Sequence, residues 1–229
     1  MRRHILFLAL SSFTLSSLVV AAENIINSEA KGKALVENFV HNIRTLSGRF
    51  EQSLIDVNNQ LVETSSGTLE IQRPDQFRWS YLEPYEQVLV ADALNVWSYD
   101  VDLAQVTVRP RSEVLNNTPA LLLSGSSNVL DQFDYIGSFT DHDTIWIQLR
   151  PKGTDNKFNK IALGFNDGEL IRIMFSDNLE QTTLISLFDV FLNEDIDAQH
   201  FQFEPPEDVD IIGIPAKSEQ NNTDELTES

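Results

Sequence analysis

The sequence predicts a mainly β protein, in which one large, twisted antiparallel sheet curls toward a barrel and helices lie against it. From Arg49 onward, apolar and polar residues alternate with a period of two in about eleven or twelve short segments, as is typical of strands. The connections between these segments are short and turn-like, so neighbouring strands are expected to run antiparallel. A sheet of this many strands usually curls, and helices must then cover its concave face.

Residues 1–22 differ in kind from the rest of the chain. The basic start MRRH is followed by the apolar stretch ILFLALSSFTLSSLVV and by small residues before Glu23. This pattern is typical of a cleaved signal peptide. A membrane anchor is the alternative, and the serines and the threonine within the apolar stretch disfavour it. We expect an exported chain that begins at Glu23, with a single domain over residues 23–214.

The segment EAKGKALVENFVHNIRTLSG, residues 29–48, predicts one amphipathic helix that ends near Gly48. Its apolar residues recur at helical spacing, and they are Leu35, Val36, Phe39, Val40, Ile43 and Leu46.

The expected strands follow in order, separated by turns. They are RFEQSLIDV, QLVETSSGTLEIQ, QFRWSYL, QVLVAD, NVWSYD, AQVTVRP, FDYIGSF, TIWIQLRP, NKIALGF, ELIRIMFS, TTLISLFDVFL and FQFEPP. The NDG at 166–168 is the clearest hairpin signal. One long interval interrupts the strands, and there Thr118 and Pro119 predict the start of a short apolar helix, ALLL. Residues 215–229 are polar and acidic, and they predict a disordered tail.

Charge and cysteine content exclude several classes of protein. The formal net charge is −19, and the chain has no cysteine. Such a surface repels nucleic acid and anionic membrane and favours basic partners, although adaptation to the host's medium explains the charge equally well. Without cysteine, neither a disulfide framework nor a lipid-modified N-terminal cysteine is possible.

No pattern in the sequence supports catalysis. His41, His142 and His200 have no metal-ligand spacing, and the DHD at 141–143 lies in an expected turn, where Asp is favoured for its backbone hydrogen bonds. No nucleophile elbow, phosphate loop or zinc motif occurs. We therefore expect no enzyme, no metal site and no cofactor.

The segment RPDQFRWSYLEP, residues 73–84, is the most specific signal. Phe77, Trp79 and Tyr81 fall on one face of a single strand, directly after Arg73. Neighbouring strands add apolar residues that we expect on the same inner face: Leu69, Ile71, Val88, Val90, Trp97 and Tyr99. Two interpretations stay open, a permanent core or a cavity beneath a removable helical lid.

The run from SGRFEQ through GTLEIQRPDQFRWSYLEPYEQVLVADALNVWSYDVDLAQVTV and NNTPALLL to FQFEPPEDVDII resembles the outer-membrane lipoprotein carrier protein (LolA) family. The resemblance covers nearly all of residues 31–212. One departure is ADALNVWSYD, where family members commonly have a glycine turn before the tryptophan. The resemblance implies an incomplete, half-open antiparallel β-barrel of about eleven strands, capped by an N-terminal helix and short inserted helices.

The resemblance also assigns roles to residues. Arg73 looks like a lid latch whose guanidinium bonds backbone carbonyls of the covering helices, because its five donors can hold several carbonyls at once. A surface ion pair is the alternative for Arg73. The implied acyl-chain cavity is lined by Leu69, Ile71, Phe77, Trp79, Tyr81, Val88, Val90, Trp97, Leu121 and Leu122.

The implied function is that of a monomeric periplasmic chaperone in outer-membrane biogenesis. It would accept lipoproteins from an inner-membrane ABC transporter and deliver them to an outer-membrane receptor (LolB), with no nucleic-acid partner. That receptor is itself a lipoprotein and needs an N-terminal cysteine, so the chain does not fit it. The alternative function is a periplasmic lipid-sensing regulator with the same half-barrel fold.

Overall fold

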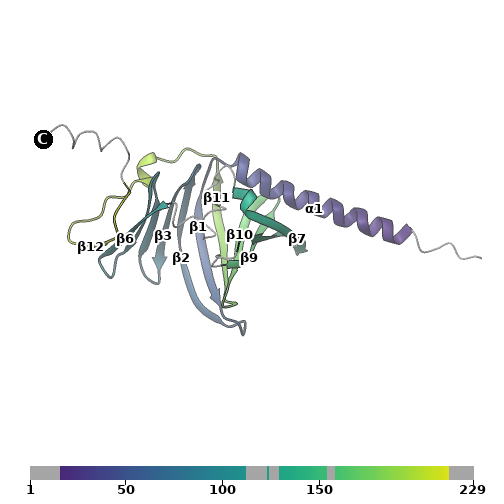
Figure 1. Cartoon of the computed structure of the whole chain (residues 1–229), viewed down its shortest axis with the longest axis horizontal. Helices are drawn as coiled ribbons and strands as arrows, with labels where there is room; N and C mark the ends of the chain where they lie inside the picture. Colours follow the sequence, from purple (N-terminus) through teal and green to yellow (C-terminus); the bar gives the residue numbers. More distant parts are fainter. Residues whose placement is uncertain (1–15, 112–122, 124–128, 154–157, 217–229) are drawn as a thin grey trace, which may run out of the picture.

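The computed structural model describes residues 16–111, 123, 129–153 and 158–216, with side chains from Glu29 onward. All of the expected helix ALLL except Leu123, and nearly all of the expected disordered tail, therefore lie outside the described residues. Within the described part, twelve strands form one sheet (Figure 1). The elements are α1 (Ser16–Asn42), β1 (Thr45–Ile55), β2 (Leu61–Gln72), β3 (Gln76–Glu83), β4 (Gln87–Ala91), β5 (Asn95–Asp100), β6 (Gln105–Pro110), η1 (Val129–Gln132), β7 (Phe133–Asp141), β8 (Thr144–Pro151), β9 (Phe158–Asn166), β10 (Glu169–Asp177), β11 (Thr182–Leu192), η2 (Ala198–Phe201) and β12 (Asp210–Ile212).

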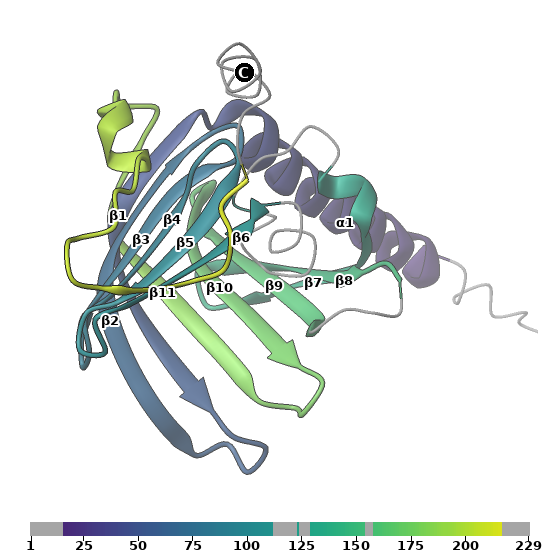
Figure 2. The same cartoon turned by 60° about the vertical axis from the view of Figure 1, so that its left-hand side comes forward.

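The sheet consists of two antiparallel meanders, β1 to β6 and β7 to β11. They join where β1 pairs with β11, and the strand order is β12-β6-β5-β4-β3-β2-β1-β11-β10-β9-β8-β7. The short β12 adds to the edge of β6 as a parallel strand, which the sequence did not predict. The sheet is strongly curved and stays open, because β7 and β12 are its two edges (Figure 2). The predicted half-open, mainly β fold is confirmed.

Helix α1 lies against the concave side near β7 and β8, while its other end extends beyond the sheet (Figure 1). Val36, Phe39 and Val40 are buried in the main core as the helical spacing predicted. The helix ends at Asn42, so the expected end near Gly48 is wrong. Residues from Thr45 onward pair with both β2 and β11, and this pairing outweighs the helical pattern that includes Leu46. Among the described helices, none combines the length and apolar character needed to span a membrane.

The C-terminal segment covers the convex face of the sheet. The prediction of a strand for FQFEPP is wrong, because this stretch begins in the short helix η2, which the Asp197 side chain caps by accepting from the Gln199 amide. Phe201 is fully buried, and the ring of Phe203 packs 5.6 Å from that of Trp97. A second, smaller core therefore lies behind the sheet, built on Trp97, Val106 and Val108.

The NDG hairpin is confirmed. Strand β9 ends at Asn166 and β10 begins at Glu169, and the two turn residues Asp167 and Gly168 have φ angles of 48° and 89°. Both angles are positive, as the favoured two-residue hairpin turn requires.

Gly67 permits a close approach between β2 and β3, next to an irregularity in their pairing. A Cβ atom at this position would collide with the backbone carbonyl oxygen of Ser80 and would also press on the ring of Phe50. Because the obstacle is backbone in a paired strand, it cannot move aside without breaking the ladder.

We expect Gly67→Ala to lower the free energy of unfolding by about 1–3 kcal/mol, the usual cost of overpacking. Thr68→Ala, an exposed change on the same strand, is the matched control and should stay within about 0.5 kcal/mol of the wild type. Urea denaturation of both variants measures the difference. Equal stabilities would show that β2 and β3 separate freely at this point.

Candidate functional site

The middle strands present an apolar concave face beneath α1. In the β2–β3 pairing, Ile71 lies opposite Phe77 and Leu69 lies opposite Trp79, so these four side chains share one face. All four are buried, and Tyr81 follows on the same face, half-buried. The sequence prediction for these five residues is correct in placing them together.

An aromatic cluster forms the centre of this face. The ring of Phe50, on β1, lies 5.0 Å from that of Trp79 and 5.1 Å from that of Tyr81, both edge-on, and Trp79 and Tyr81 stack at 6.4 Å. Such aromatic pairs contribute about 0.5–1.5 kcal/mol each beyond their burial. Phe50 was not among the residues predicted here, because only the register of β1 against β2 brings it to this face.

Three residues expected in the cavity lie on the other face of the sheet. Trp79 pairs with Leu89, which puts Leu89 on the concave face and the flanking Val88 and Val90 on the convex face. Val90 in turn pairs with Trp97, so Trp97 is convex as well. The prediction that Val88, Val90 and Trp97 face the cavity is therefore wrong, and so is the expectation that Tyr99, which pairs with Val88, lies on the inner face. Strand β4 is apolar on both faces, because the C-terminal segment covers the back, and alternation alone cannot assign its sides.

Leu121 and Leu122, also expected in the cavity, lie outside the described residues. Leu123, the next residue, is described and is buried in the main core with α1 and the concave face. Its carbonyl oxygen accepts a hydrogen bond from Nε of Arg73, at 3.1 Å.

Arg73 joins this segment to α1. Its Nη1 donates to the carbonyl oxygens of Phe39, of Val40 at 3.0 Å and of Ile43 at 3.0 Å. The last carbonyls of a helix have no partner within the helix, and a cation is favoured there by the helix dipole. The carbonyl contacts implied for Arg73 are thus present, whereas its role as a latch stays a prediction.

The charge of Arg73 is enclosed rather than exposed. Burial lowers its pKa to about 10, so it is still cationic at neutral pH. The guanidinium lies 4.5 Å from the centre of the Phe39 ring, a cation–π contact that partly replaces lost hydration. The alternative of a surface ion pair does not fit this arrangement.

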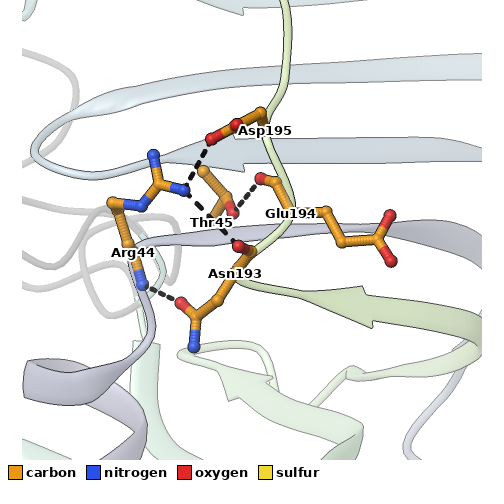
Figure 3. A network of polar contacts seen from close by, with 5 residues as sticks. All are labelled: Arg44, Thr45, Asn193, Glu194 and Asp195. Atoms are coloured by element: carbon orange, nitrogen blue, oxygen red, sulfur yellow. Dashed lines mark hydrogen bonds and ion pairs between the residues drawn. The ribbon is translucent and has the colours of Figure 1, made fainter.

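A polar network fixes the junction between α1 and β1 to the end of β11 (Figure 3). The backbone N–H of Arg44 donates to Oδ1 of Asn193 at 2.7 Å, and its guanidinium bonds Asp195 at 2.8 Å. The hydroxyl of Thr45 donates to the carbonyl of Glu194. The C-terminal end of α1 is therefore anchored to both β1 and β11.

The concave face becomes polar toward the hairpin ends of β1 to β5. A pocket of about 270 Å³ opens there, which we call the rim pocket. Its polar side chains surround Tyr81, and they are Gln52, Glu63, Ser65, Glu83, Gln87 and Asp100. No local sequence pattern predicted this pocket, because its lining residues come from five different strands.

Tyr81 marks the border between the apolar and polar parts. Burial raises its pKa to about 12, the hydrogen bond from its hydroxyl to Gln52 lowers the pKa, and the charge of Glu63 raises it further. The folded chain thus holds this proton more tightly than the unfolded chain. The contribution of Tyr81 to stability is full below pH 10 and is lost as the pH rises toward about 12.

An absorbance titration of the phenolates tests this environment. We expect one of the four tyrosines to ionise near pH 12, and Tyr81→Phe to remove that phase. Tyr85→Phe is the control, because Tyr85 is 70% exposed, and it should leave the late phase in place. Circular dichroism at each pH confirms that the chain is folded. A late phase that survives Tyr81→Phe would contradict the assignment.

Comparison with known proteins assigns this chain to a family. Residues 41–204 match the family model described as "Outer membrane lipoprotein carrier protein LolA". An outer-membrane lipoprotein carrier protein of Halorhodospira halophila is 37% identical over 199 residues, which cover 86% of this chain and 94% of the relative. One of Nitrosospira multiformis is 34% identical over 186 residues, or 81% of this chain and 90% of the relative. Among solved structures, a LolA superfamily protein of Nitrosomonas europaea has a TM-score of 0.45 at 11% identity, covering 75% of this chain and 97% of that one. The chain belongs to the outer-membrane lipoprotein carrier protein (LolA) family.

Proposed function

We propose that the chain is a periplasmic chaperone that accepts lipoproteins from an inner-membrane ABC transporter, shields their acyl chains beneath α1 and delivers them to an outer-membrane receptor. The observation that carries this proposal is the hold of Arg73 on α1 and on Leu123, above an apolar concave face. A permanent core does not need hydrogen bonds from a charged side chain to the segments that cover it.

The hydrogen bonds of Arg73 can be broken and formed again when α1 moves. Hydrogen bonds from one guanidinium to several carbonyls break together when the guanidinium or the helix end moves, and water then satisfies both sides. The apolar contacts of Phe39 and Val40 with the sheet are non-directional, so acyl chains can replace them at little cost. Cargo entering beneath α1 would therefore exchange one apolar partner for another.

The energy of lipid exposure explains why a carrier is needed. Each methylene costs roughly 0.8 kcal/mol in water, so a sixteen-carbon chain costs on the order of 12 kcal/mol. An apolar interior removes most of that cost without using ATP itself. Loading would then draw its energy from the transporter, and unloading would depend on a more apolar acceptor.

The experiment that tests this function is release of lipoproteins from spheroplasts that carry the transporter. With ATP, the purified chain beginning at Glu23 should bring lipoproteins into the soluble fraction as a one-to-one complex. If no lipoprotein leaves the membrane, yet the protein binds a fluorescent fatty acid, the lipid-sensing regulator becomes the better account.

Arg73→Leu should leave the fold intact and stall the transfer cycle. Leucine fills the space of the side chain stem but leaves the carbonyls at the end of α1 without their donor, so α1 is no longer held closed. We expect at least about a tenfold loss in the rate at which loaded cargo passes to receptor-containing liposomes, equivalent to roughly 1.4 kcal/mol.

Arg78→Leu is the matched control, because Arg78 lies on β3, shortly after the turn that contains Arg73, and on the convex face, where it bonds the carbonyl of His200. It removes the same charge without touching α1. Normal transfer by Arg73→Leu, or an equal defect in Arg78→Leu, would overturn the latch role.

A further inference from the structure

The rim pocket continues the apolar face along the same side of the sheet. Gln52 pairs with Ser65, Tyr81 with Gln87, and Gln87 with Asp100, so these side chains share the concave face with Trp79. A strand advances about 3.3 Å per residue, so the four steps from Trp79 to Glu83 span about 13 Å. A ligand whose apolar part lies on Trp79 can therefore place a polar part in the rim pocket.

Ser65 is the observation within the pocket that points to a polar ligand. Its side chain is only 6% exposed, yet it lines the pocket. Among the described residues, its hydroxyl has no hydrogen-bond partner. The buried polar atoms that lack a partner do not include this hydroxyl, so it is open to the pocket, where a donor or acceptor of a ligand can bond it in place of water.

The charges around the pocket define the ligand further. Glu63, Glu83 and Asp100 contribute three carboxylates, and no lysine or arginine of the described chain lines the pocket. Asp100 uses Oδ1 to accept from the Leu103 amide at 3.0 Å. In the described part of the chain these carboxylates form no ion pair, and they do not gather closely enough to hold a metal ion. Spread acceptors of this kind suit an ammonium or guanidinium group.

We propose that the rim pocket binds a lysine or arginine side chain of the cargo, close to the cargo's acylated N-terminus. The inference rests on the proposed carrier function. The apolar face would take the acyl chains, and the rim pocket would select cargo whose first residues after the acylated cysteine are basic. The cargo is the occupant we infer, because the pocket and the acyl-binding face form one continuous surface through Tyr81.

Binding of two synthetic diacylglyceryl-cysteine peptides tests the proposal. They are identical except that one carries lysines after the acylated cysteine and the other carries glutamines in their place. We expect the chain to bind the lysine peptide about three- to tenfold more tightly at low salt, a range set by partly exposed ion pairs. The preference should shrink as salt is added.

The variant Glu63→Gln/Glu83→Gln/Asp100→Asn should lose this preference and keep its affinity for the glutamine peptide, because asparagine retains the acceptor that the Leu103 amide needs. The control is Glu51→Gln/Glu169→Gln/Glu207→Gln, which removes three exposed carboxylates away from the pocket. Its net charge equals that of the first triple variant. It should keep the preference.

Three results would overturn the inference. Equal affinity of the wild type for both peptides would do so and leave the carrier function standing. An equal loss of preference in both triple variants would assign the effect to diffuse surface charge. Binding of neither peptide would overturn the proposed function together with the inference.

Discussion

The bonds from Arg73 to the end of α1 and to Leu123 are the interaction on which the cover of the concave face depends. An open, curved sheet leaves an apolar concave face that must be covered, and α1 covers it chiefly near β7 and β8, with Phe39 also against Phe165 of β9. The polar network around Arg44 and Asn193 fixes the C-terminal end of α1 next to the end of β11. Arg73 then ties that end to Leu123, so two parts of the cover depend on one side chain.

The two faces of the sheet are covered by different parts of the chain. The C-terminal segment covers the convex face and leaves the concave face to α1. Phe201 and Phe203 cover the convex face, so β4 and β5 are buried there as firmly as a core requires. Trp97 is fixed further by a hydrogen bond from its indole N–H to Asp92. Under the proposed function, this covered convex face would keep the sheet together while the concave face exchanges α1 for acyl chains. The smaller convex core thus adds stability that does not depend on what covers the concave face.

Sequence patterns predicted the strands well and assigned their faces unevenly. For β3 the alternation of Phe77, Trp79 and Tyr81 with polar residues was sufficient, because only one side of this strand is apolar. For β4 the same reasoning failed, since Val88 to Ala91 are all apolar and the register against Leu89 decides their sides. The contacts of Arg73 were expected only through a family resemblance. The rim pocket was not predicted, because a site assembled across five strands depends on pairing, which no local window contains.

The division of the concave face into apolar and polar parts also fits the demands on a carrier. Apolar burial supplies affinity without direction, so it holds acyl chains of any cargo and lets them slide out toward another apolar surface. Charges at an open rim contribute less to affinity, because water and salt screen them, yet they distinguish one partner from another. Glu63 and Glu83 are exposed while Trp79 is buried, so selection and shielding are separated along one strand direction. Under the proposed function, this separation would let the chain select cargo without binding it too tightly to release it.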